Sequence, residues 1–158
     1  MTTPAKTTIL AAIKTAFESI TVVNGYKSTV DTVEQAIRSA NCVLTAKRPW
    51  LGFMTERERF EPEGPNYIFV TLPIYVGGHV HATTEALVDA AIANLQDDVI
   101  AAIYADPQLG ETAVDVKLLD GDDDIGDPDR AMPEGETGYS GTFDQHWEIT
   151  YQRLTEST

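Results

Sequence analysis

The strongest structural signal in the chain is the stretch Tyr67-Ile-Phe-Val-Thr-Leu-Pro-Ile-Tyr-Val76. Aliphatic residues occupy nearly every second position and share one face, while the aromatic residues Tyr67, Phe69 and Tyr75 lie on the other. This alternation predicts a β-strand with one face in a hydrophobic core.

A second strand is predicted just before it, over residues 50–60. The turn-forming sequence Glu61-Pro-Glu-Gly-Pro65 joins the two segments, which predicts a long antiparallel hairpin. Gly77-Gly78 is expected to end the second arm of this hairpin. Pro73 has no N–H to donate to a neighbouring strand, and it therefore predicts an edge strand or a bulge.

Two amphipathic helices are predicted on either side of the hairpin. The first is expected to follow an N-cap at Thr3 and to end at Asn24-Gly25. The second is expected to follow an N-cap at Thr83 or Thr84 and to end near Tyr104. Each has one apolar face at helical spacing, formed by Ile9, Ile13, Phe17 and Ile20 in the first and by Val88, Ile92, Leu95, Val99 and Ile103 in the second.

Three further segments complete the predicted architecture. Residues 26–48 are predicted to be a strand followed by irregular chain, and alternating patterns around Val116 and Trp147 predict two more strands. The acidic segment at about 120–138, rich in Gly and Pro, is predicted to be a long loop between them. We therefore expect a single α+β domain over residues 1–158, a two-layer sandwich of a mainly antiparallel sheet with two helices on one face.

The composition limits the functions that this chain can have. Its 158 residues are 42% hydrophobic, which is enough for one domain with its own core. With 11 Lys and Arg against 25 Asp and Glu, the formal net charge is −14, which argues against binding nucleic acid through a broad basic face and against binding anionic membranes. No apolar run reaches the length of a membrane span, and no signal-peptide pattern is expected at the N-terminus.

The charge is unevenly distributed along the chain. Residues 1–60 hold eight Lys and Arg and five Asp and Glu, whereas residues 61–158 hold three and 20. Such an asymmetry fits copies of one chain, or a chain and its partner, that meet head to tail with opposite charges in contact. A solvated acidic loop that keeps the protein soluble would explain it as well.

The acidic segment does not match a calcium-binding loop. When Asp120 is taken as position 1 of an EF-hand loop, position 6 should be glycine and is Ile125. Position 12 should be a bidentate glutamate and is Ala131. A solvated or interface loop is therefore expected, with weak adventitious binding of divalent ions as the alternative.

Few residues indicate catalytic chemistry. His79 and His81 are two apart, so on an extended chain they could form half of a zinc or copper site, although no spacing assigns a third ligand. The alternative is two polar residues at a strand end. Cys42 is the lone cysteine, which excludes an intrachain disulfide. No nucleophile elbow or phosphate-binding loop occurs, so no catalytic residue and no cofactor are expected.

Two regions are candidates for a subunit interface. One is the aromatic second face of the predicted hairpin, and the other is the segment from Trp50 through the charged run at 56–59. A loop or the N-terminal helix of the same chain could cover them instead. The candidate interface residues are Trp50, Phe53, Glu56, Arg57, Glu58, Arg59, Tyr67, Phe69 and Tyr75.

The order of segments resembles that of the tail terminator, or tail-completion, proteins of long-tailed bacteriophages. The resemblance covers nearly all of the chain, although residues 38–60 look longer than the family pattern. The matching parts are the helix Ile9-Leu-Ala-Ala-Ile-Lys-Thr-Ala-Phe17 leading to Asn24-Gly-Tyr26, the strand 67–76, the helix 87–104 leading to Asp106-Pro-Gln-Leu-Gly110, and the strand Trp147-Glu-Ile-Thr-Tyr151.

The resemblance implies a structural virion protein of the tail or neck, assembled in the host cytoplasm, with neither catalysis nor a cofactor. It implies a homo-hexameric ring that caps the tail tube, stops polymerisation of the tube protein and joins the tail to a head-side connector or stopper protein. DNA would pass through the ring without specific binding. The candidate acidic residues of the lumen or ring face are Asp120, Asp122, Asp123, Asp124, Asp127 and Asp129.

Three alternatives remain open from the sequence. A head-completion or neck connector protein also forms rings on the DNA path. A small metal-dependent enzyme would use His79 and His81 with a carboxylate. A monomeric binding module would form no ring at all.

Overall fold

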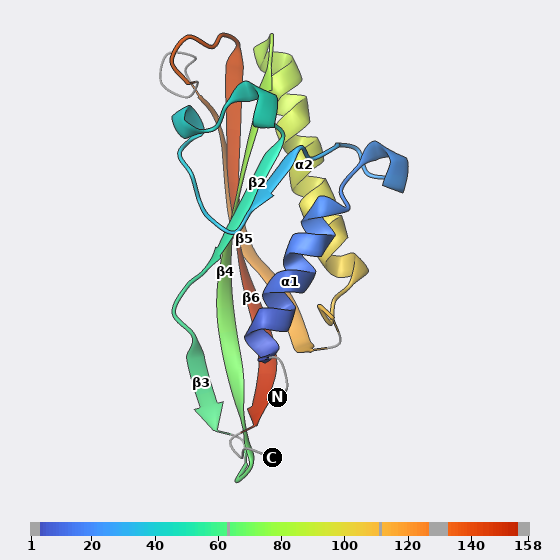
Figure 1. Ribbon diagram of the computed structural model, residues 1–158, viewed down its shortest axis with the longest axis vertical. Helices are drawn as coiled ribbons and strands as arrows, with labels where there is room; N and C mark the ends of the chain where they lie inside the picture. The colour runs from blue at the N-terminus through green and yellow to red at the C-terminus, as the bar shows by residue number, and fades with distance from the viewer. Residues whose placement is uncertain (1–3, 63, 111, 127–132, 155–158) are drawn as a thin grey trace.

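A mainly antiparallel six-stranded sheet forms one layer of the protein and two helices form the other (Figure 1). The computed structural model describes residues 4–62, 64–110, 112–126 and 133–154. The strand order is β1-β2-β4-β6-β5, and β3 pairs with β4 next to β2. The elements are α1 (Ala5–Glu18), β1 (Thr32–Glu34), β2 (Trp50–Thr55), β3 (Arg59–Pro62), β4 (Tyr67–Ala82), α2 (Glu85–Ala105), β5 (Ala113–Gly126) and β6 (Tyr139–Leu154).

The predicted strand at 67–76 is confirmed, but β4 continues through Gly77-Gly78 to Ala82. The expectation that the two glycines end the strand is therefore wrong. Neither glycine has the positive φ that would turn the chain out of the strand. Gly78 serves packing instead: a Cβ at this position would lie 2.2 Å from the ring of Phe143 on β6. The glycine therefore lets an aromatic ring cross the centre of the sheet.

The predicted strand at 50–60 is two strands, β2 and β3, which pair antiparallel with different parts of β4. The break between them faces Pro73, whose carbonyl accepts a hydrogen bond of 3.0 Å from the N–H of Glu56. Pro73 lies in a central strand and not at the sheet edge. Its missing donor falls where the neighbouring strand is interrupted, which is how the sheet tolerates it.

Helix α1 ends at Glu18, earlier than the Asn24-Gly25 that the sequence suggested. Those residues instead close a short 3-10 turn, η1 (Val22–Asn24), after which Gly25 adopts a left-handed φ of 93°. The N-cap predicted at Thr3 lies outside the described residues, and Pro4 directly precedes the helix.

Helix α2 begins as the sequence predicts. The Thr84 hydroxyl accepts a hydrogen bond of 3.2 Å from the N–H of Leu87, and Glu85 lies in the first turn, where the helix dipole favours a negative charge. The helix ends at Ala105, one residue beyond Tyr104.

The apolar faces of both helices pack on one face of the sheet and form a single core. Gly141 on β6 permits the close approach of α2, since a Cβ there would lie 2.3 Å from Ile92. The predicted helical stripes are confirmed by burial of Ile9, Ile13, Phe17, Ile20, Val88, Ile92, Leu95, Val99 and Ile103.

The prediction of a loop from 120 to 138 is wrong for its first part. Residues 120–126 continue β5 and pair with β6 as far as Gly126 opposite Ser140. Residues 127–132 lie outside the described part of the chain. The strand predicted within 26–48 is confirmed but short: β1 has three residues and is followed by two 3-10 turns, η2 (Ala40–Cys42) and η3 (Thr45–Lys47).

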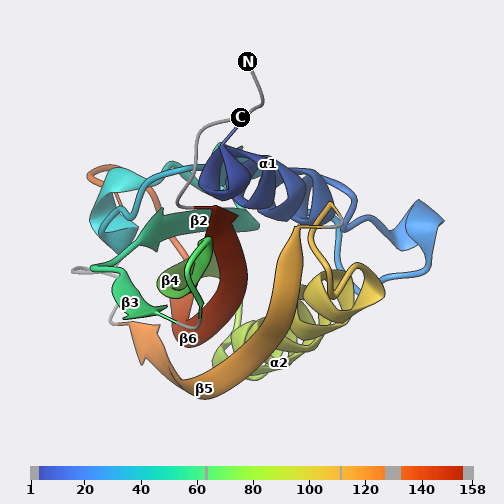
Figure 2. The same ribbon diagram turned by 90° about the horizontal axis from the view of Figure 1, so that it is seen from below.

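The two sides of the molecule are built from different parts of the sequence. Seen along the long axis, α1 and β2 lie on one side, and β5 curves from a start next to α1 to an end on the opposite side (Figure 2). At one end, the strands β3, β4 and β6 extend beyond the helices (Figure 1). Among the described residues, no helix is long and apolar enough to cross a membrane.

Candidate functional site

The face of the sheet that points away from the helices, here called the open face, holds four of the nine predicted interface residues. Tyr67, Phe69 and Tyr75 of β4 all lie on it and are half-buried. The rings of Tyr67 and Phe69 pack edge to face with centroids 5.7 Å apart. The aromatic residues therefore partly cover one another, which reduces the apolar surface they present.

A polar chain crosses the open face from β4 to β5. The Tyr75 hydroxyl donates a hydrogen bond of 3.0 Å to Asp144, and the ring of Tyr75 packs edge to face against His146 at 4.9 Å. His146 Nδ1 in turn lies 2.5 Å from Asp120 Oδ1 on β5. Burial, together with the hydrogen bond to the Asp144 carboxylate, raises the pKa of Tyr75 to about 12.

The charged run at 56–59 is divided between the two faces of the sheet. Arg59 lies on the open face and pairs with Glu148 at 2.9 Å. Glu58 points to the helix side, where it accepts hydrogen bonds of 2.9 Å from Lys6 of α1 and from the Tyr151 hydroxyl of β6. Burial opposes ionisation of Glu58, but these donors outweigh it and leave its pKa lowered. Glu58 therefore ties the sheet to α1, whereas Glu56, Arg57 and Arg59 are exposed.

Trp50 and Phe53 do not belong to a surface, which corrects their assignment as interface residues. Phe53 is fully buried on the helix side and packs edge to face against Phe17 of α1, with centroids 5.7 Å apart. Trp50 is buried on the other side of β2, where its ring stacks on His79 at 5.1 Å and its indole N–H donates to Glu34 at 2.9 Å. The N-terminal helix and the segment before β2 cover these residues within one chain.

The two histidines proposed as half of a metal site have different environments. His79 is buried, and its Nε2 lies 2.7 Å from the carbonyl oxygen of Arg38, while its Nδ1 has no hydrogen-bond partner among the described residues. Burial lowers the pKa of His79, so the neutral ring is favoured. His81 is exposed. No group of three or more potential ligands is placed to hold a metal ion within the described ranges.

The acidic residues singled out by the sequence lie mainly on a strand and not in a loop. Asp120, Asp122 and Asp123 are exposed on β5, and the backbone of Asp124 pairs with Thr142 of β6. Asp127 and Asp129 lie outside the described residues. Strand β5 is the last strand of the sheet, and among the described residues it pairs with β6 alone.

Strand β5 also contains two irregularities that the sequence did not predict. The register with β6 shifts between Ala113 and Asp115 and again between Leu118 and Asp120, which makes Val114 and Leu119 the inserted residues. Both are exposed, Val114 by 59% and Leu119 by 46%. Each bulge thus turns an aliphatic side chain towards solvent.

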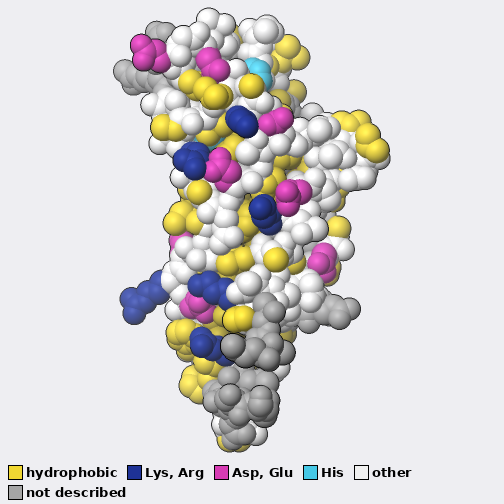
Figure 3. Space-filling model, in the orientation of Figure 1, with side chains coloured by type: hydrophobic (Ala, Val, Ile, Leu, Met, Phe, Trp, Pro, Cys, Tyr) yellow, Lys and Arg dark blue, Asp and Glu magenta, His cyan; other side chains and the backbone are white. Residues whose placement is uncertain are grey.

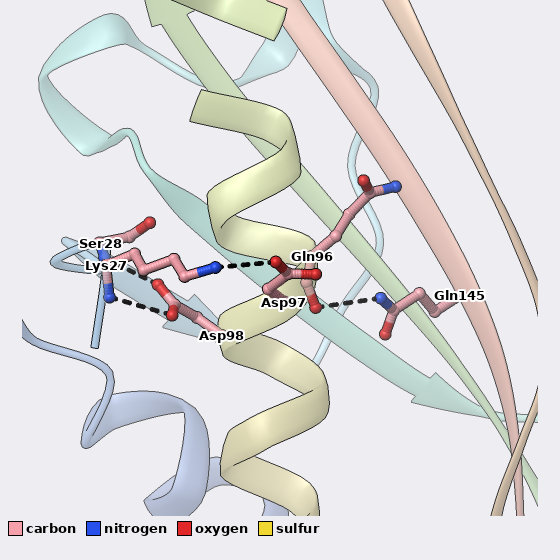
Figure 4. Close-up of polar contacts among 6 residues, drawn as sticks. All are labelled: Lys27, Ser28, Gln96, Asp97, Asp98 and Gln145. Atoms are coloured by element: carbon pink, nitrogen blue, oxygen red, sulfur yellow. Dashed lines mark hydrogen bonds and ion pairs between the residues drawn. The ribbon is translucent and has the colours of Figure 1, made fainter. Parts of the chain in front are cut away.

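Sequence reasoning missed a buried carboxylate on α2. Asp98 is only 3% exposed and accepts hydrogen bonds from the backbone N–H groups of Lys27 (3.0 Å) and Ser28 (2.7 Å) (Figure 4). Its neighbour Asp97 makes an exposed ion pair of 2.9 Å with the Lys27 ammonium group. Helical spacing could have identified Asp98, since it lies three residues after the buried Leu95 and four before the buried Ala102.

Figure 4 also shows Gln145 of β6 donating a hydrogen bond of 3.4 Å to the backbone carbonyl of Gln96. Polar contacts therefore link α2 to the sheet on one side and to the η1 turn region on the other. These contacts fix the helix in place and hold no reactive group.

Sequence reasoning also missed Arg48, which is buried behind β2. Its guanidinium group donates to the backbone carbonyls of Ala40 (2.6 Å) and Val80 (3.0 Å) and to the Ser140 hydroxyl (2.7 Å). Arg48 therefore binds the irregular segment before β2 to the ends of β4 and β6. No pattern in the sequence marks it for this role.

A shallow groove lies between α1 and the C-terminal end of α2. Its volume is about 390 Å³, and its lining consists mainly of the small side chains Ala11, Ala12, Ala16, Ala102 and Ala105. Asp106 is the only carboxylate in the lining. The groove has the residues neither of a catalytic site nor of a phosphate site.

The space-filling view shows the α1–β2 side of the molecule (Figure 3). Lys and Arg side chains are spread over its middle part, between Asp and Glu side chains and apolar patches. This distribution follows from the sequence, because residues 1–60 supply eight of the 11 basic residues.

No family model matches the chain. No curated protein matches it either.

Proposed function

We propose that this chain is a structural virion protein, a ring-forming tail terminator of a long-tailed bacteriophage. In the virion it forms a homo-hexameric ring at the head-side end of the tail. The ring caps the tail tube, stops polymerisation of the tube protein and joins the tail to the head-side connector or stopper protein.

The observation that carries this proposal is the opposite placement of two unlike surfaces. The acidic end of β5, residues 120–126, lies on one side, and α1 and β2, with the exposed cations Lys14 on α1 and Arg57 after β2, lie on the other. A chain with two different, complementary surfaces associates head to tail, and such contacts form a closed ring when their rotation closes.

The net charge supports a place on the DNA path. Each copy brings a formal charge of −14, so the assembled ring repels DNA phosphates and lets DNA pass without binding.

Electron micrographs of particles assembled without this protein test the proposal. Overlong tails are the expected result, because nothing stops the growth of the tube. Tails of normal length on intact particles would contradict it. Tails of normal length that are detached from filled heads would support the alternative, a head-completion or neck connector protein.

A further inference from the structure

The outer edge of β5 is the longest strand edge that the structure leaves open. Over 14 residues, from Ala113 to Gly126, the strand pairs with β6 on one side, and no strand among the described residues pairs with its other side. An open edge presents backbone N–H and C=O groups to other chains, and proteins usually shorten or cover such edges.

The two bulges make this edge different from a protected one. A bulge can bend an edge strand away from partners, but here each inserts an aliphatic residue and leaves it exposed. Val114 and Leu119 are five residues apart on the same strand. By contrast, Ala113 and Val116 of the same strand are buried against the core. Val114 and Leu119 therefore give this charged strand an apolar component that the core does not cover.

The charges on β5 determine which partner it accepts. The strand carries five Asp and one Lys, so two β5 strands placed edge to edge would bring aspartates together. Like charges opposite each other destabilise strand pairing, which disfavours a symmetric β5–β5 contact. The partner surface has to supply cations.

The α1–β2 side of a second copy supplies them. Lys14 of α1, Lys47 before β2 and Arg57 between β2 and β3 are all exposed, and α1 and β2 lie opposite the acidic end of β5 at residues 120–126 (Figure 2). Apolar patches between the charges on this side offer a surface for aliphatic side chains (Figure 3). The α1–β2 side therefore offers cations to the aspartates of β5 and apolar side chains to its exposed aliphatic residues.

We propose that the bulged outer edge of β5 docks onto the α1–β2 side of a second copy of this chain. Val114 and Leu119 form the apolar centre of the contact, and the aspartates of β5 face the cations of the partner copy. The inference rests on the proposed function, since it names the contact that builds the ring. The contact is head to tail, so an open oligomer has one free β5 edge and one free α1–β2 side until the ring closes.

Sedimentation velocity on the full chain, over a range of concentrations and at low and high salt, tests the contact. We expect the wild type to associate, and to associate more weakly at high salt because ions screen the aspartate–cation contacts. The double variant Val114→Lys/Leu119→Lys should weaken association at least about tenfold. The matched control is Leu87→Lys on α2, because Leu87 is exposed by 56% and belongs to neither of the two proposed surfaces. This variant should associate like the wild type. Circular dichroism verifies that each variant is folded.

A mixing experiment tests the head-to-tail geometry. A second variant, Lys14→Glu/Arg57→Glu, removes the cations of the partner surface and should also be monomeric alone. Mixed with the β5 variant, it should form complexes of two chains and no larger, because each pair has only one intact contact. Rings or longer oligomers in the mixture would contradict the geometry.

Three results would overturn the inference. They are a wild type that remains monomeric at every concentration, a β5 variant that associates like the wild type, and a cation-side variant that still dimerises through β5. These outcomes differ from failure of the proposed function, which is normal tail length in particles lacking the protein. A chain that associates through β5 but does not limit tail length would keep the contact and reject the terminator role.

Discussion

Strands β5 and β6 are neighbours of similar length, but they differ in regularity. The 16 residues of β6 pair with β4 without a register shift, and its inward residues are buried from Gly141 to Tyr151. The 14 residues of β5 pair on one side, shift register twice and carry five aspartates. The regular strand β6 stabilises the fold, whereas the irregular strand β5 leaves one edge open to contacts with other molecules.

The largest expected effect is on β6. Trp147 is 1% exposed and packs against Tyr104, so Trp147→Ala should lower the free energy of unfolding by about 3–5 kcal/mol. Leu119→Ala on β5 is the control and should change it by less than about 0.5 kcal/mol, since Leu119 already contacts solvent. Urea denaturation measures both. Equal losses would show that β5 is as much part of the core as β6.

Two neighbouring aspartates of α2 show the same contrast, since Asp98 is buried and Asp97 is exposed. Asp98→Ala would leave the N–H groups of Lys27 and Ser28 without their acceptor, at a cost of about 2–3 kcal/mol. Asp97→Ala removes only an exposed ion pair, at a cost of about 0.5 kcal/mol or less. Thermal or urea denaturation of both variants provides the comparison. A small loss for Asp98→Ala would mean that water replaces the carboxylate.

Periodic burial explains what the sequence could predict. The stripes of α1 and α2, and the alternation of β4 and β6, repeat because one face of each element contacts the core. These elements and the two-layer α+β fold were predictable for that reason. The burial of Phe53 by Phe17 was not, because contacts between distant segments leave no local pattern.

The failed predictions have a common physical origin. Aspartate is disfavoured in strands, so residues 120–126 looked like a loop, but on an edge strand the backbone can pair while the carboxylates remain in water. Gly77-Gly78 looked like a strand end, but Gly78 makes room for Phe143. In both cases a tertiary contact overrides local preference. Of the candidate site, the sequence identified the acidic segment, but not the bulges at Val114 and Leu119.

Alkaline titration distinguishes tyrosines with a raised pKa from tyrosines that are exposed to solvent. Burial, with the hydrogen bond to Glu58, raises the pKa of Tyr151 on β6 to about 12, the same value as for Tyr75. Because the pKa is higher in the folded state than in the unfolded state, the protonated tyrosine stabilises the fold. This stabilisation is fully present below the unfolded-state pKa near 10 and is lost as the pH rises through about 12. Absorbance titration of Tyr151→Phe should lack part of the component that ionises near this pH. An unchanged titration curve would contradict the assignment.

The smallest effect on stability is expected at the acidic edge. Asp122→Asn/Asp123→Asn should change the free energy of unfolding by less than about 0.5 kcal/mol, since both side chains are exposed. The same substitutions should reduce the salt dependence of self-association, because they remove charges from the proposed contact. Denaturation and sedimentation on the same samples measure the two properties. A large loss of stability would mean that these aspartates have a structural role.

The most direct test of the head-to-tail account is a cryo-electron microscopy reconstruction of the assembled protein in the neck of the particle. We expect a closed ring in which the outer edge of β5 faces the α1–β2 side of the next copy, with Val114 and Leu119 buried between them. A ring in which β5 faces solvent, or a symmetric pairing of two β5 strands, would contradict it.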